Sequence, residues 1–71
     1  MNKERRNRIV SAIYKIEELI QNILDDEQES YDNMPENLLT SENAIVSEEA
    51  QESLDSAINA LEEAISYLEE I

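Results

Sequence analysis

The fold is decided by the last stretch of the chain, residues 54–71, which reads LDSAINALEEAISYLEEI. Leucine returns every seven residues, and an Ala-Ile pair follows three positions after Leu54 and again after Leu61. A seven-residue apolar period is typical of α-helices that pack against a neighbour with the left-handed crossing of coiled coils. The stretch therefore predicts a long amphipathic helix, which we place over about residues 41–70.

A second helical pattern occupies the N-terminal half of the chain. Its isoleucines recur at intervals of four and three residues, at Ile9, Ile13, Ile16, Ile20 and Ile23. This spacing marks one side of an α-helix, and no period-two alternation of a strand is sustained anywhere. Asn2 is suited to cap the start of such a helix. The pattern predicts a first helix over about residues 3–31.

The two patterns are separated by residues 31–37, YDNMPEN, which hold the single proline of a chain that has no glycine. The residue before a proline is pushed out of the α region, so the first helix should end just before Pro35. We expect a turn over about residues 32–40, with Thr40, Ser41 or Ser47 capping the second helix. The fold class predicted is all-α: an antiparallel helical hairpin that forms one domain over residues 1–71.

The charges are separated along the chain. All five basic residues lie within the first fifteen positions, whereas residues 16–71 hold 17 acidic residues and no base. In an antiparallel hairpin, the basic side chains of the first helix come close to the acidic end of the second. We expect Lys3, Arg5, Arg6 and Arg8 to lie near Glu62, Glu63, Glu69 and Glu70.

Two helices alone cannot enclose a core. A domain of 71 residues rarely gains enough stability from one core without a disulfide bond, a metal ion or a partner. This chain has no cysteine and no histidine, the residues that would form a disulfide bond or bind a structural metal ion. We therefore expect a homodimer that forms a four-helix bundle. The predicted oligomer seam consists of Ile13, Ile16, Ile20, Leu54, Ala57, Ile58, Leu61, Ala64, Ile65 and Leu68. The alternative is a hairpin that docks its apolar seam onto a helix of another protein.

Composition argues against most kinds of active site. Without cysteine or histidine there is no thiol nucleophile, no imidazole base and no transition-metal ligand of the usual kinds. A calcium loop needs a glycine at its bend, which this chain cannot supply. We expect no enzyme, no cofactor and no metal ion.

No apolar run is long enough to span a bilayer and no signal peptide is recognisable, so we predict a cytoplasmic protein with no membrane partner. The basic patch is too small beside the acidic remainder for direct nucleic-acid binding.

The acidic side of the second helix is the candidate binding site. The residues proposed to contact a partner are Glu48, Glu52, Asp55, Glu62, Glu63 and Glu69. Carboxylates three or four positions apart on a helix lie about 5–6 Å from one another, a spacing comparable to that of successive phosphates in DNA. An acidic rod of this kind is able to occupy the basic channel of a nuclease, and long-range attraction would speed its association. The plainer interpretation is that the acidity keeps a small dimer soluble.

The segment around the predicted turn and the repeats that follow it resemble a known group of proteins. Residues 26–38, DEQESYDNMPENL, followed by Thr40-Ser41-Glu42 and the Leu-x-x-Ala-Ile repeats, resemble small acidic proteins encoded in phages and prophages of Gram-positive bacteria. Many of those proteins carry Ser-Glu-Arg-Gly-Glu at the start of the second helix, where this chain has Ser41-Glu42-Asn43-Ala44-Ile45. The resemblance implies a viral protein that acts inside a host bacterium. It makes an inhibitor of a host defence or DNA-handling protein, of the restriction or CRISPR nuclease class, the leading hypothesis, with a structural or adaptor protein as the alternative.

Overall fold

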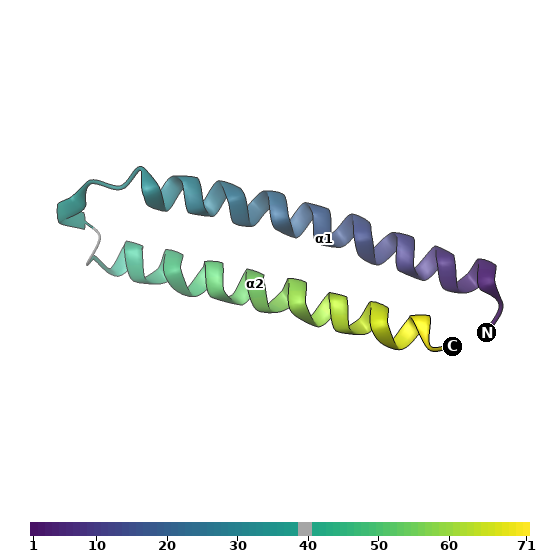
Figure 1. Cartoon of the computed structure of the whole chain (residues 1–71). Coiled ribbons are helices and arrows are strands. Elements are labelled where there is room, and N and C mark those ends of the chain that lie inside the picture. The colour runs from purple at the N-terminus through teal and green to yellow at the C-terminus, as the bar shows by residue number, and fades with distance from the viewer. Residues whose placement is uncertain (39–40) are drawn as a thin grey trace.

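A computed structural model describes residues 1–38 and 41–71 of the chain, and in them it shows two long α-helices joined by a short connection. Helix α1 spans Lys3–Asp32, a 3₁₀ turn η1 spans Glu36–Leu38, and helix α2 spans Glu42–Glu69. Figure 1 shows the helices side by side and antiparallel, with both chain termini at one end and the connection at the other. The predicted all-α hairpin is confirmed. We call the end with the termini the open end and the end with η1 the closed end.

The helix boundaries follow from local chemistry. The side chain of Asn2 accepts a hydrogen bond of 2.9 Å from the backbone N–H of Arg5 and so caps α1. The backbone N–H of Asn33 still bonds to the carbonyl of Glu29, and Pro35 prevents the helix from continuing. At the start of α2, the hydroxyl of Ser41 accepts a bond of 3.3 Å from the backbone N–H of Ala44. The predicted boundaries differ from the observed ones by one residue, and Thr40, a candidate cap, lies outside the described residues.

The seam between the helices is a pair of complementary stripes with spacings of three and four residues. On α1 the half-buried or buried side chains are Arg6, Val10, Ile13, Glu17, Ile20, Leu24, Glu27 and Tyr31, with Met34 just beyond the helix. On α2 they include Ala44, Ser47, Gln51, Leu54, Ile58, Leu61, Ile65 and Leu68. These are the a and d positions of heptad repeats, with Val10 and Ala44 taken as a.

The pairing of the two stripes alternates large with small residues at the closed end. The hydroxyl of Tyr31 reaches Glu48, which places Tyr31 opposite Ser47 in the seam. Stepping along both stripes from this point brings Met34 opposite Ala44, and Leu24 opposite Leu54. Ala44 is 0% exposed and Ser47 is 4% exposed, so these small residues of α2 are tightly packed at the closed end.

The seam also contains acidic side chains. Glu17 sits between Ile13 and Ile20, and its Oε1 atom is buried without a hydrogen-bond partner. Glu27 is half-buried and belongs to the same stripe. The apolar contact between the helices is therefore interrupted at these two positions.

No helix in the described part of the chain is apolar enough over a sufficient length to cross a membrane.

Candidate functional site

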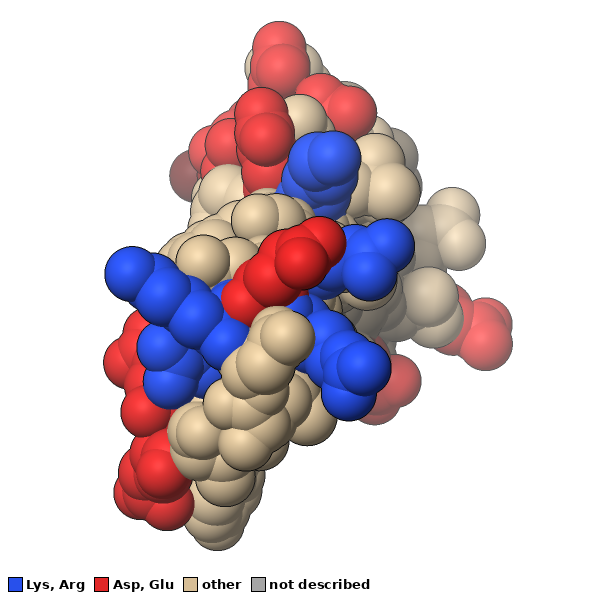
Figure 2. Space-filling view, turned by 90° about the vertical axis from the view of Figure 1, so that its right-hand side faces the viewer, with Lys and Arg blue, Asp and Glu red and all other residues tan. Residues whose placement is uncertain are grey.

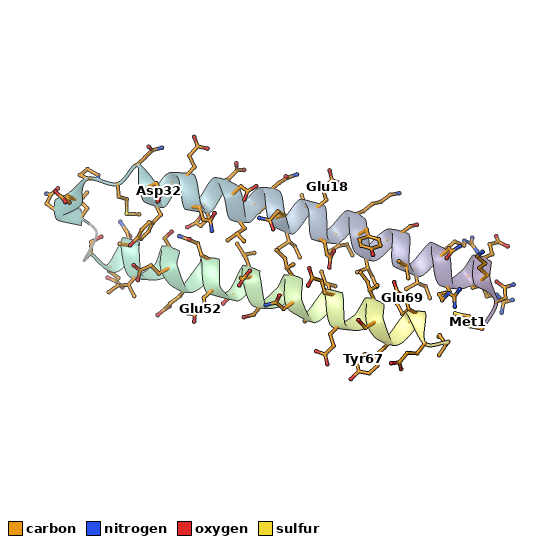
Figure 3. The ribbon with its side chains drawn as sticks, viewed as in Figure 1. Met1, Glu18, Asp32, Glu52, Tyr67 and Glu69 are labelled. Atoms are coloured by element: carbon orange, nitrogen blue, oxygen red, sulfur yellow. The ribbon has the colours of Figure 1, made fainter. Side chains whose placement is uncertain are left out.

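The hairpin is a single layer of two helices, so it has two long faces with different chemistry. The molecule measures 55 × 15 × 11 Å along its principal axes. Because the helices run in opposite directions, their e positions flank the seam on one face and their g positions flank it on the other. The b positions extend the first face, and the c positions extend the second. Figure 3 shows Glu18 and Glu52, at b, and Tyr67, at c, projecting from the outer sides of their helices.

The face formed by the e and b positions is acidic, and we call it the acidic face. Its carboxylates, all exposed, are Glu48, Glu52, Asp55, Glu62 and Glu69 of α2 with Glu4, Glu18, Asp25 and Asp32 of α1. In the described residues, no lysine or arginine occupies an e or b position of either helix. These nine carboxylates therefore present one sign of charge along the whole length of the rod.

Five of the six predicted partner-binding residues lie on the acidic face. The sixth, Glu63, is at the f position on the outer side of α2, where it accepts a hydrogen bond of 3.4 Å from the hydroxyl of Tyr67. The sequence interpretation missed the contribution of α1. Glu18, Asp25 and Asp32 are separated by seven residues, and this period was the signal that they share a side of their helix.

Hydrogen bonds organise part of the acidic face. The hydroxyl of Tyr31 donates to Glu48 at 2.5 Å, and the amide of Gln21 donates to Asp25 at 2.9 Å. The hydrogen bond to Glu48 raises the pKa of the Tyr31 hydroxyl above its usual value, and partial desolvation and the negative charges of Glu48 and Asp32 add to the effect. Tyr31 thus holds a carboxylate of α2 against α1 while it stays neutral at physiological pH.

The opposite face, formed by the g and c positions, is apolar, and we call it the apolar face. From α1 it receives Ile9, Ala12, Ile16, Leu19 and Ile23, all exposed. From α2 it receives the half-buried Ala50, Ala57 and Ala64 together with the exposed Val46, Ser53, Ala60 and Tyr67. No charged residue interrupts either list. Contiguous exposed apolar strips of this kind are typical of surfaces at which proteins associate with other molecules.

The predicted oligomer seam is divided between the hairpin interior and the apolar face. Seven of its residues lie in the a and d positions between α1 and α2: Ile13, Ile20, Leu54, Ile58, Leu61, Ile65 and Leu68. Ile16 lies on the apolar face and is 48% exposed. Ala57 and Ala64 lie at the border of the interior and the apolar face and are half-buried.

The basic residues form a cluster at the open end. Figure 2 looks at this end of the molecule, where the blue Lys and Arg side chains gather. Arg5 and Arg8 line a shallow hollow together with Ile9 and Ala12, at the end of the apolar face. The side-chain hydrogen bonds of the described residues include no arginine–carboxylate pair, so the pairing of this cluster with the acidic end of α2 stays a prediction.

Neither the arrangement of possible metal ligands nor the comparison with known proteins identifies a ligand or a function. Within residues 1–38 and 41–71, no three acidic side chains come together in the way that a metal ion requires. A scan against protein-family models, a search of curated proteins and a search of solved structures found no match to this chain.

Proposed function

We propose that this protein is a non-enzymatic binding protein whose acidic face occupies the basic, DNA-binding surface of a protein partner and excludes DNA from it. The observation that carries the proposal is the row of nine exposed carboxylates along one face of a rigid rod, with no basic side chain among them. The partner class that fits is a bacterial nuclease or other DNA-handling protein. The resemblance to phage-encoded acidic proteins supports this class and a cytoplasmic setting in the host.

The geometry suits a surface that has evolved to hold a phosphate backbone. The e-position carboxylates of α2, from Glu48 to Glu69, repeat every seven residues, which is about 10.5 Å along a helix. Glu52 and the α1 carboxylates fill the space beside this row. Because both helices are continuous and packed together, the backbone positions that carry the carboxylates are fixed before binding, and association requires no ordering of the backbone. The single-signed face also increases the rate of encounter with a basic partner.

The experiment compares two variants with the same change in net charge. The test variant reverses three acidic-face residues, Glu52→Lys, Asp55→Lys and Glu62→Lys. The matched control reverses Glu29, Glu36 and Glu49, which lie outside both faces. Each protein is immobilised and exposed to nuclease-treated bacterial lysate at low salt, and bound proteins are eluted with a salt gradient.

The readout is the DNA binding of the captured proteins. We expect wild type and control to retain basic DNA-binding proteins and to compete with a labelled duplex for them, and the test variant to lose both properties while its helical circular dichroism is unchanged. Competition that survives the test reversal, or captured proteins that do not bind DNA, would contradict the proposal.

A structural or adaptor role is the second candidate, and the exposed apolar face favours it. Leu61 and Leu68 lie inside the hairpin, so replacing them would unfold the protomer. The exposed Ile16 and Leu19 are the informative positions. An adaptor that works through the apolar face loses its partner when Leu19 is replaced by Glu, whereas a protein that works through the acidic face retains its partner.

A further inference from the structure

The apolar face leaves large side chains in water along most of the hairpin. Ile9 is 40% exposed, Ile16 is 48% exposed and Leu19 is 59% exposed. Among the described residues, the buried ones are Leu24, Ala44, Ser47 and Ile65. One layer of two helices is too thin to bury more, and a small domain of this kind gains the missing burial from association.

We propose that a second copy of the chain covers the apolar face, and that the two hairpins lie with the open end of each beside the closed end of the other. In this arrangement a two-fold axis passes between the α1 helices of the two copies near Ile16, and α1 packs antiparallel against α1 of the second copy. The α2 helices approach each other along their alanines. The proposal concerns the apolar face and does not depend on the function proposed for the acidic face.

The first argument is the order of residues along the α1 part of the apolar face. The stripe begins with Arg5, continues through apolar residues centred on Ile16, and ends with Asp26. Reversing the stripe about Ile16 brings Ile9 toward Ile23 of the second copy and Arg5 toward Asp26 of the second copy. The stripe is therefore complementary to itself only when the two copies run in opposite directions.

The second argument is the hollow at the open end. It has an apolar floor at Ile9 and Ala12 and a basic rim at Arg5 and Arg8. The segment that the two-fold axis brings to it carries Ile23 and Asp26, one apolar and one acidic side chain at the spacing of a helical turn. The apolar floor and the basic rim of the hollow thus match the apolar and acidic side chains at the opposite end of the same stripe.

The third argument is the charge of the two ends. Residues 25–36 hold six acidic residues and no base, whereas residues 1–15 hold five bases and one acid. Two copies in the same direction would bring the two acidic closed ends together, and like charges in contact oppose association. Opposite directions place each acidic closed end beside a basic cluster.

The oligomeric state is the first test. Sedimentation velocity at micromolar concentration should show a dimer for wild type and a monomer for Leu19→Glu. Tyr14→Glu is the matched control, because Tyr14 is a 53% exposed residue at an e position on the acidic face. This control should remain dimeric, and circular dichroism should report the same helix content for all three proteins. A monomeric wild type, or a dimer that Leu19→Glu leaves intact, would overturn the proposal.

Cross-linking then tests the direction of the two copies, since the chain has no cysteine of its own. Single variants Ile9→Cys, Ile16→Cys and Ile23→Cys are treated with a short thiol-specific cross-linker. Ile16→Cys should form a covalent dimer. Ile9 lies about 10.5 Å along the helix from Ile16, so two copies of Ile9→Cys stand about 21 Å apart and should not cross-link.

A mixture of Ile9→Cys and Ile23→Cys chains should cross-link to each other. Efficient cross-linking of Ile9→Cys to itself would show parallel α1 helices. A dimer in which no pair cross-links would show that α1 faces α2 of the other copy. Either result would overturn the proposed arrangement.

A charge exchange provides an independent readout. Arg5→Asp and Asp26→Arg should each weaken the dimer about three- to tenfold, because each opposes like charges at both ends of the interface. The double variant should restore the wild-type dissociation constant within about twofold. Effects of the two substitutions that simply add would contradict the contact between Arg5 and Asp26 of the second copy.

Discussion

The hydroxyl of Tyr31 in α1 donates a hydrogen bond of 2.5 Å to the carboxylate of Glu48 in α2, joining residues 17 positions apart in the chain. The other side-chain hydrogen bonds of the described residues connect positions no more than four apart. This bond therefore fixes the alignment of the two helices at the closed end, near the buried small residues Ala44 and Ser47.

Tyr31→Phe should change how the stability depends on pH. The folded protein holds the Tyr31 proton more tightly than the unfolded chain, because the pKa is raised above its ordinary value of 10.0 by the bond to Glu48. The corresponding stabilisation is present below pH 10 and is lost as the pH rises through the folded-state pKa. Melting temperatures measured by circular dichroism between pH 7 and pH 11.5 should fall less steeply in the variant.

Tyr67→Phe is the control for this measurement. Tyr67 also donates to a glutamate, Glu63, but both residues belong to α2, so their bond does not join the helices. The control should keep the wild-type decline at high pH. If Tyr31→Phe declines as steeply as the wild type, the hydrogen bond between the helices does not contribute to the pH dependence.

Glu17→Leu should stabilise the hairpin by about 1–2 kcal/mol, because it removes a buried carboxylate oxygen that has no partner and adds apolar contact in the seam. Chemical denaturation monitored by circular dichroism measures the change. Glu18→Leu is the matched control, since Glu18 is the adjacent residue and is exposed on the acidic face. Equal effects at both positions would show that relief of negative charge, rather than burial, is responsible.

Ala44→Leu should destabilise the protein by about 1–3 kcal/mol. Ala44 is fully buried opposite Met34, and the additional side-chain carbons have no space there. Ser56→Leu, a similar enlargement at an exposed f position of α2 outside both faces, should leave the melting temperature nearly unchanged. A tolerated Ala44→Leu would mean that the helices are aligned differently at the closed end.

Added salt should raise the melting temperature. The net charge is −13, and residues 16–71 contain acidic but no basic side chains, so repulsion within the folded molecule exceeds attraction. Salt screens this repulsion. Melting curves at increasing sodium chloride concentration should therefore shift upward, and the shift should be smaller for a variant with three acidic-face residues replaced by glutamine. A melting temperature that decreases with salt would indicate that ion pairs at the open end dominate.

The helices themselves were predictable from the sequence because their signals are local. Asn2, Ser41 and Pro35 mark the boundaries, and the apolar periods mark the helical state. Which side of each helix faces the other was harder to predict. The isoleucines of α1 belong to two adjacent stripes, one that faces α2 (Ile13 and Ile20) and one on the apolar face (Ile9, Ile16 and Ile23). Because the stripe that faces α2 also contains the acidic Glu17, the sequence alone does not show which stripe is buried.

The partner helix decides between the stripes. Ile13 and Ile20 face inward on the same side of α1 as Tyr31, whose hydroxyl bonds to Glu48 of α2, and this pairing is not visible in α1 alone. The acidic face was predicted for α2, where five of six residues share it. The α1 carboxylates were missed because they join the face only through the alignment of the two helices.

The position of both chain ends at the open end determines how the hairpin responds to mechanical force. Tension applied between Met1 and Ile71 acts across the seam, not along it. It would therefore separate the facing pairs of seam residues one after another, starting with Val10 and Leu68. The helices would separate at Glu17 early and at low force. The closed end, where Tyr31 bonds to Glu48, would be the last part of the seam to separate.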